Sequence, residues 1–149
     1  MQIELEQFLP YRLSVLANTV SQGIARGYRQ RHDISVTEWR IMAVLGRFAG
    51  LTASEVTERT AMDKVAISRG VKSLAEKGLL ERRIDPGDRR RQRLFITPGK
   101  GRRMLDGVIP MAHDYERQLL QPLSAAERAT LSDLLAKLQS RAESLDSRS

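Results

Sequence analysis

The chain has 149 residues, of which 41% are hydrophobic and 29% charged, and its 25 Lys and Arg residues against 18 Asp and Glu residues give a formal net charge of +7. This composition allows one globular core, and the excess of positive charge favours a polyanionic partner, either a nucleic acid or an anionic membrane surface. Because the sequence contains no cysteine, disulfides, thiolate metal sites, thiol nucleophiles and thiol redox sensors are excluded.

The sequence has no feature of a membrane or exported protein. Its apolar runs are too short to span a bilayer, and the first ten residues carry acids where a signal peptide carries bases. We therefore expect a cytoplasmic protein with no membrane partner. His32 and His113 each lack a second histidine within helical reach, so we expect surface or packing roles for both and no bound metal.

Helix start signals divide the chain. Ser35 and Glu38 have the spacing of a capping box, with Thr37 as a competing cap. Similar signals are the segment 52–55, Asp63 ahead of Lys64, Thr97 followed by Pro98 at the first helical position, and the segment 124–127. Together with the apolar periodicity they predict six helices, over residues 8–31, 36–48, 53–60, 64–77, 99–120 and 125–145. Pro110 predicts a kink or a break in the fifth helix.

Only the segment 79–97 departs from the helical period. Two extended runs, 79–84 and 91–97, flank a turn region, 85–88, that contains Pro86-Gly87. They predict a β-hairpin whose loop is longer than the tightest turns. We therefore expect a mainly α fold with a small β-hairpin wing: a winged helix-turn-helix lobe over 34–98, and a helical dimerisation region from 1–33 and 99–149, all within one domain of residues 1–149.

The predicted helices 53–60 and 64–77 form a helix-turn-helix that leads directly into the hairpin. In the second helix Ile67, Val71 and Leu74 form an apolar stripe at helical spacing. The opposite face carries the polar residues Lys64, Ser68, Arg69 and Lys72. Such a face suits the major groove of DNA, where Arg and Lys donate to guanine and Ser adapts to several base edges, while Lys72 lies where a phosphate is the more natural partner.

The hairpin is rich in arginine. Six arginines fall between Glu81 and the end of the segment, namely Arg82, Arg83, Arg89, Arg90, Arg91 and Arg93. The tip residues Arg89, Arg90 and Arg91 suit a narrow minor groove. We expect Arg90 to enter the groove and Asp88 to orient its guanidinium. A charge run is ordinarily solvated surface, but this one directly follows a helix-turn-helix pattern, and the two signals together favour DNA binding.

Residues 51–69, 74–82, 85–90 and 94–101 resemble the multiple antibiotic resistance regulator (MarR) family. The resemblance covers residues 35–101, and the flanking helices match by pattern only. The family's wing motif, an Asp, one residue and an Arg, matches Asp88 and Arg90. The resemblance implies an obligate homodimer with interlocked terminal helices and a small-molecule pocket between the dimer part and each DNA-binding lobe. Some members sense oxidants through a cysteine, which this chain lacks.

The end helices independently favour an interface. An apolar stripe in the last helix comprises Leu131, Leu134, Leu135, Leu138, Ala142 and Leu145, more than a terminal helix of a small monomer needs. It can pair across a two-fold axis with residues near the N-terminus, namely Phe8, Leu9, Leu13 and Leu16. Burial of the stripe within the same chain is the alternative.

We expect a transcriptional repressor of a pseudo-palindromic operator that an aromatic or phenolic effector releases and that needs no cofactor. The candidate effector-binding residues are Tyr28, His32, Trp39, Arg40 and Met111. Trp39 and Met111 are also suited to a core, and Arg40 to pairing with an acid. An enzyme is disfavoured, since phosphate-binding loops, dinucleotide fingerprints and catalytic triads are missing from the sequence. A winged helix that binds RNA or protein is the second alternative.

Overall fold

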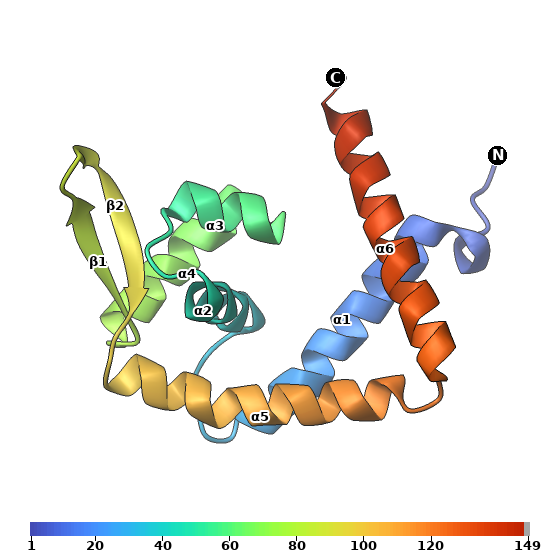
Figure 1. The fold of residues 1–149 in the computed structure, drawn as a ribbon, viewed down its shortest axis with the longest axis horizontal. Coiled ribbons are helices and arrows are strands. Elements are labelled where there is room, and N and C mark those ends of the chain that lie inside the picture. Colours follow the sequence, from blue (N-terminus) through green and yellow to red (C-terminus); the bar gives the residue numbers. More distant parts are fainter. Residues whose placement is uncertain (148–149) are drawn as a thin grey trace. The chain divides into compact units, whose positions relative to one another are not determined.

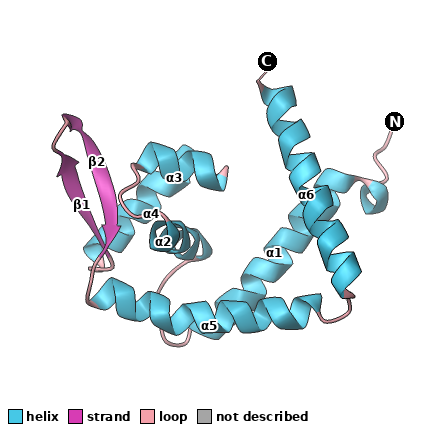
Figure 2. Cartoon of the chain, in the orientation of Figure 1, coloured by secondary structure: helices cyan, strands magenta, loops and turns pink. Residues whose placement is uncertain are grey.

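Helices dominate the structure, a computed structural model that describes residues 1–147 (Figures 1 and 2). The elements in chain order are the short 3-10 helix η1 (Leu5–Gln7), α1 (Leu9–Tyr28), α2 (Val36–Arg47), α3 (Ala53–Thr60), α4 (Lys64–Glu76), β1 (Leu80–Asp85), β2 (Asp88–Ile96), α5 (Lys100–Leu120) and α6 (Ala125–Asp146). The six expected helices are all present, each ending within three residues of its expected position. The fold class is therefore confirmed as mainly α with a β-hairpin wing.

Side-chain caps start most of the helices where the sequence indicates. Ser35 accepts from the amide of Glu38 at 3.1 Å while the Glu38 carboxylate accepts from the amide of Ser35 at 3.0 Å, which is a complete capping box. The starts of α3 and α6 have the same reciprocal arrangement. Asp63 caps α4 by accepting from the amide of Val65. These caps fix the positions of α2, α3 and α4 in the chain.

Gly78 ends α4 and turns the chain into the wing. Its φ is +75°, in the left-handed region that favours glycine. The amide of Leu79 donates to the carbonyl of Leu74, and that of Gly78 to the carbonyl of Ala75, which is the Schellman arrangement. The recognition helix of the predicted helix-turn-helix therefore stops at a defined residue, and the hairpin begins two residues later.

The hairpin loop is shorter than the sequence analysis predicted. The strands β1 and β2 pair antiparallel from Leu80 opposite Ile96 up to Asp85 opposite Asp88, so only Pro86 and Gly87 lie in the turn. The carboxylate of Asp85 accepts from the amide of Gly87 at 2.9 Å and closes this turn locally. A further bridge joins Leu51 to Leu94, so the base of the wing is fastened to the segment between α2 and α3.

One expectation for α5 is corrected, and the break considered at Pro110 is excluded. The helix begins at Lys100, so Pro98 lies in the preceding turn and is not its first residue, although the Thr97 hydroxyl accepts from the amide of Gly101 as a cap. The helix also runs through Pro110 without a break. A proline removes one backbone donor, and the three buried side chains of the preceding turns, Met104, Leu105 and Val108, hold the helix in place.

The chain divides into two units, one of residues 1–112 and one that begins at His113. The first holds the core, to which α1, α2, α3, α4, α5 and the wing all contribute. Ile41, Leu45, Ile67, Leu74 and Leu105 are almost fully buried in it. The expected lobe 34–98 lies within this unit.

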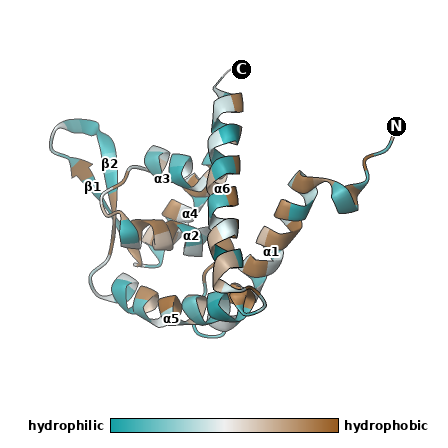
Figure 3. Cartoon of the chain, turned by 45° about the vertical axis from the view of Figure 1, so that its right-hand side comes forward, coloured by the Kyte–Doolittle hydropathy of each residue, from teal (hydrophilic) through white to brown (hydrophobic). Residues whose placement is uncertain are grey.

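Apolar side chains remain exposed on the terminal helices. In the first unit they include Phe8, Leu9, Leu13 and Leu16, which lie at the N-terminal end of the chain. In the second unit they are Leu119, Leu131, Leu134, Leu135, Leu138 and Leu145. Figure 3 shows hydrophobic, brown segments along both α1 and α6. The α6 stripe is therefore not covered by its own unit.

Candidate nucleic-acid interface

The exposed face of α4 carries the residues that the sequence analysis selected. Lys64, Ser68, Arg69 and Lys72 are all exposed, while Ile67, Gly70, Val71 and Leu74 of the opposite face are buried. The helix therefore buries one stripe against α2 and α3 and presents a polar, basic stripe to solvent. An α-helix with such a face fits the major groove of B-DNA.

A buried carboxylate anchors the C-terminal end of α4 to the start of α2. Glu38 is only 7% exposed, and it accepts from Ser73 Oγ at 3.0 Å and from Lys77 Nζ at 2.9 Å in addition to closing its capping box. Burial alone would raise the pKa of Glu38, but hydrogen bonds from Ser35, Lys77 and Ser73 and the charge of Lys77 outweigh it and lower that pKa. One ionised side chain thus sets the position of the recognition helix. The sequence analysis identified only its capping role, since the contact spans 39 residues.

The wing tip combines an exposed guanidinium with a local turn. The side chain of Arg90 is 93% exposed, and its Nε lies 3.5 Å from Asp88 Oδ1. The same carboxylate oxygen accepts from the backbone amide of Arg90 at 3.0 Å. Asp88 therefore holds the backbone of Arg90 more closely than it holds the guanidinium.

Other wing arginines hold the hairpin in place. Arg93 pairs with Asp85 at 3.0 Å and donates to the Gly50 carbonyl at 2.8 Å. Arg83 pairs with Glu81, and its guanidinium lies over the ring of Phe95. These contacts leave the arginines of the tip, rather than those of the stem, available for a ligand.

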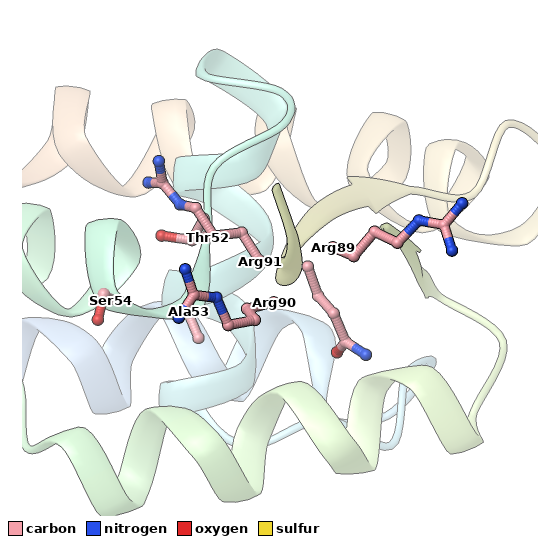
Figure 4. Close-up of a pocket in the computed structure, with 7 residues that line it drawn as sticks. Thr52, Ala53, Ser54, Arg89, Arg90 and Arg91 are labelled. Atoms are coloured by element: carbon pink, nitrogen blue, oxygen red, sulfur yellow. The ribbon is translucent and has the colours of Figure 1, made fainter. Parts of the chain in front are cut away.

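A basic hollow lies between the wing and the start of α3 (Figure 4). It has a volume of about 460 Å³, and its lining residues are Thr52, Ala53, Ser54, Arg89, Arg90, Arg91 and Gln92. Arg90 and Arg91 reach from β2 toward the first residues of α3, and Arg91 Nη2 lies 3.5 Å from Glu55, the residue that closes the α3 capping box. Ser54 was not among the residues predicted for the interface, although its place in the first turn of a capped helix was visible in the sequence.

The candidate effector-binding residues gather where α1, α2 and α5 meet in the first unit. The rings of Tyr28 and Trp39 lie 6.0 Å apart. Met111 of α5 packs against α1 at Gly27, where a Cβ would lie 3.6 Å from Met111 Sδ. His32 packs against α5 at Gly107, where a Cβ would lie 3.7 Å from His32 Nε2. The side chain of Arg40 donates to Ser21 Oγ at 2.6 Å, so the observed partner is a hydroxyl and not the acid considered above.

Tyr28 stands out in this group. It is fully buried, yet its hydroxyl has no hydrogen-bond partner among the residues that the structure describes. Burial raises the pKa of this phenol, and the charges of Arg29 and Arg40 offset part of the shift. A buried hydroxyl without a partner is unfavourable, so a hydrogen-bond acceptor that entered here would be stabilised.

Within residues 1–147, no helix is long and apolar enough to cross a membrane. The same part of the chain contains no group of three or more His, Asp or Glu side chains arranged to hold a metal ion.

The sequence of α3, turn, α4 and hairpin, with a basic face on α4 and exposed arginines at the hairpin tip, defines a winged helix-turn-helix DNA-binding protein. A model of the MarR family matches residues 32–91. The chain belongs to the MarR family of transcriptional regulators, whose members bind DNA.

Known proteins resemble the chain beyond the matched segment. The crystal structure of a MarR/EmrR family transcriptional regulator from Acinetobacter sp. ADP1 is 29% identical, with a TM-score of 0.86 over 95% of this chain and 99% of that chain. The transcriptional repressor NicR of Pseudomonas putida is 33% identical over 85 residues, which are 57% of this chain and 53% of NicR. BpsR of Bordetella bronchiseptica, whose DNA binding is regulated by 6-hydroxynicotinic acid, shares the fold at 19% identity, with a TM-score of 0.80 over 93% and 98% of the two chains.

Proposed function

We propose that the chain is a homodimeric repressor that binds a pseudo-palindromic duplex operator and leaves it when a small aromatic ligand binds. The observation that carries the DNA-binding part is the exposed polar face of α4 opposite its buried stripe, next to a wing with exposed arginines. Repression is supported by the similarity to NicR, a repressor.

In the proposed complex, α4 lies in the major groove. Arg69 and Ser68 meet base edges, Lys64 lies in the first turn beside them, and Lys72, two turns along, meets a phosphate. Arg90 enters the adjacent minor groove, with Arg89 and Arg91 beside it and Asp88 ordering the tip. The hollow between the wing and α3 receives the backbone between the two grooves, because the N-terminus of α3 and the arginines around it both attract phosphate.

The dimer is supported by the apolar residues left exposed on α1 and α6. Two copies related by a two-fold axis place two α4 helices in successive major grooves, so the half-site centres lie about 10 bp apart. We propose the division expected from sequence: residues 34–98 bind DNA, and 1–33 and 99–149 form the dimer.

The effector is proposed to be an aromatic compound with a hydrogen-bond acceptor. Tyr28 offers it a buried hydroxyl that has no hydrogen-bond partner among residues 1–147. Trp39 and Met111 offer apolar contacts, and Arg40 or His32 offers a positive partner for a carboxylate. BpsR shows that a protein of this fold can respond to such a compound.

The DNA-binding proposal is tested by footprinting the purified protein on the DNA upstream of its own coding region, with RNA and single-stranded DNA as competitors. We expect a protected two-fold site and a steep loss of affinity with salt. Arg69→Ala should cost about 1–3 kcal/mol of binding and relax the preference at one base position per half-site, whereas Arg90→Ala should weaken binding most on A·T-rich flanks. Preferred binding to RNA would contradict the proposal, and equal losses on every sequence would contradict the separate groove assignments.

The effector proposal is tested by adding a panel of small aromatic acids to the protein–DNA complex. At least one compound should release the DNA from the wild type. Tyr28→Phe should require a higher concentration of that compound while binding the operator equally well without it, because the hydroxyl has no partner in the free protein. Equal release from both proteins would exclude Tyr28 as a ligand contact.

A further inference from the structure

One apolar side chain lies on the DNA-facing side of the recognition helix. The large apolar residues that are strongly exposed fall almost entirely outside the lobe 34–98, on the segments 1–16 and 119–145. Within the lobe they are Val65, 54% exposed on α4, and Ile84, 62% exposed on β1. The dimer interface proposed above uses the terminal segments, so it gives no reason for the exposure of Val65.

Val65 lies at the centre of the exposed α4 face. A helix advances about 100° per residue, so Val65 lies within about 60° of Ser68, Arg69 and Lys72 and about 180° from Leu74. Leu74 is fully buried, so the direction of Val65 is directly away from the core. It is also in the first turn of α4, where its amide is held by Asp63, and the N-terminal residues of a recognition helix are those that meet base edges.

The major groove presents one apolar group, the C5 methyl of thymine. A valine in a helix is nearly confined to one rotamer, so it can pack against that methyl with little loss of side-chain entropy. The same side chain placed against the amino group of cytosine or the carbonyl of guanine would remove water from a polar group without replacing the hydrogen bond. Valine at this position therefore favours binding to a site with thymine and disfavours binding to a site with a G·C pair.

We propose that Val65 is a specificity-determining residue that recognises the C5 methyl of one thymine in each half-site. The proposal rests on the DNA-binding function given above and adds the base that this residue reads. Lys64, Ser68 and Arg69 supply polar contacts on the same face, and Val65 supplies the apolar one.

The test begins with selection of tight-binding duplexes from a random library by the full-length protein and by Val65→Ala. Because Val65 is exposed and alanine favours a helix, the variant should be as stable as the wild type. The wild type should select thymine at one symmetric position in each half-site, and the variant should lose that preference alone. Ile84→Ala, which truncates the other exposed apolar residue of the lobe, should keep the wild-type preference.

The selected duplex is then made with deoxyuridine in place of that thymine, which removes only the methyl group. We expect the affinity of the wild type to fall about fourfold for each methyl removed, and the affinity of Val65→Ala to change by less than half of that factor. An equal loss in both proteins, or no loss in the wild type, would overturn the role of Val65 while leaving DNA binding intact. Failure to enrich any duplex would instead overturn the DNA-binding function and the inference with it.

Discussion

Glu38 connects three parts of the DNA-binding lobe through one carboxylate. It closes the α2 cap, accepts from Ser73 and pairs with Lys77. A group whose folded pKa is lowered stabilises the fold above its unfolded pKa, and this stabilisation is lost as the pH falls through the folded value. The pKa of Glu38 is lowered from about 4.5, so its contribution is complete near neutral pH and disappears in acid.

Glu38→Gln should therefore lower the free energy of unfolding by about 1–3 kcal/mol at pH 7, because the charged partner of Lys77 is lost. The difference from the wild type should shrink below about pH 4.5. Urea unfolding of both proteins between pH 3 and 7 measures it. Glu127→Gln is the matched control, since Glu127 closes a capping box on an exposed helix start and should cause a smaller loss. A difference that stays constant with pH would show that the charge of Glu38 contributes nothing.

Asp88 places a negative charge in a wing that is proposed to approach phosphates. Simple charge counting predicts that Asp88→Ala binds DNA more tightly. The geometry predicts the opposite for a specific site, because Asp88 holds the backbone and the guanidinium of Arg90, and a freed arginine loses more entropy on binding.

Asp88→Ala should therefore weaken specific binding while non-specific binding stays equal or becomes slightly tighter. Both affinities are measured by titration at one salt concentration. Asp106→Ala is the control, since it removes the same charge from an exposed Asp–Arg pair on α5 and should leave the ratio of the two affinities unchanged. A gain in specific affinity for Asp88→Ala would show that Asp88 is only a surface charge.

At the scale of elements, Gly101 allows α5 to approach the end of α4 closely. A Cβ at this position would overlap the carbonyl oxygen of Leu79 and lie 2.8 Å from Ile96 Cγ2. Both neighbours are in the buried junction of helix and wing, and a backbone carbonyl cannot rotate away. The packing of the wing on the lobe therefore depends on the absence of a side chain here.

Gly101→Ala should destabilise the fold by about 2 kcal/mol or more, because overpacking must move the backbone. Gly107→Ala in the same helix is the matched control. Its Cβ would lie 3.7 Å from the nearest atom, His32 Nε2, so the better helix propensity of alanine should stabilise the fold by about 0.5–1 kcal/mol. Thermal unfolding of the two variants gives the comparison. A Gly101→Ala protein as stable as the wild type would mean that α5 can shift freely.

Local signals explain which elements the sequence predicts correctly. Every helix from α2 to α4 starts at a side-chain cap, and a cap needs only neighbours in the chain. The hairpin turn was misjudged because aspartate is a poor strand former, and Asp85 is kept in β1 by its pair with Arg93, eight residues away. The bridge between Leu51 and Leu94 likewise depends on a contact that no local pattern records.

The same distinction applies to the candidate site. The polar face of α4 follows from helical periodicity and was predicted. The anchor of Glu38 on Lys77 and the orphaned hydroxyl of Tyr28 depend on how helices pack, so the sequence alone could not indicate them. Val65 could be predicted in part. Its position on the polar face was visible in the sequence, but only the structure shows that its side chain is exposed.

At the scale of the whole molecule, the apolar stripe of α6 determines the proposed assembly. Leu131, Leu134, Leu135, Leu138 and Leu145 are all exposed in their unit, and a stripe of this length on a terminal helix is unusual for a monomer. A second copy of the chain can bury it, and binding a two-fold operator then couples two half-sites in one event.

Leu134→Glu combined with Leu138→Glu should convert the dimer to a monomer, because two buried charges without partners oppose association. Ser140→Glu is the control, since Ser140 is exposed and lies at least about 120° around the helix from Leu131, Leu134 and Leu138, and it should leave the dimer intact. Sedimentation equilibrium at micromolar concentration measures the assembly, and titration with a two-half-site duplex measures binding. The monomer should bind this duplex weakly, with no higher affinity than for a duplex that contains a single half-site. The reason is that each lobe then binds in a separate event and loses its own entropy of association. A wild-type chain that is monomeric at micromolar concentration and still binds the full site tightly would contradict the two-fold assembly.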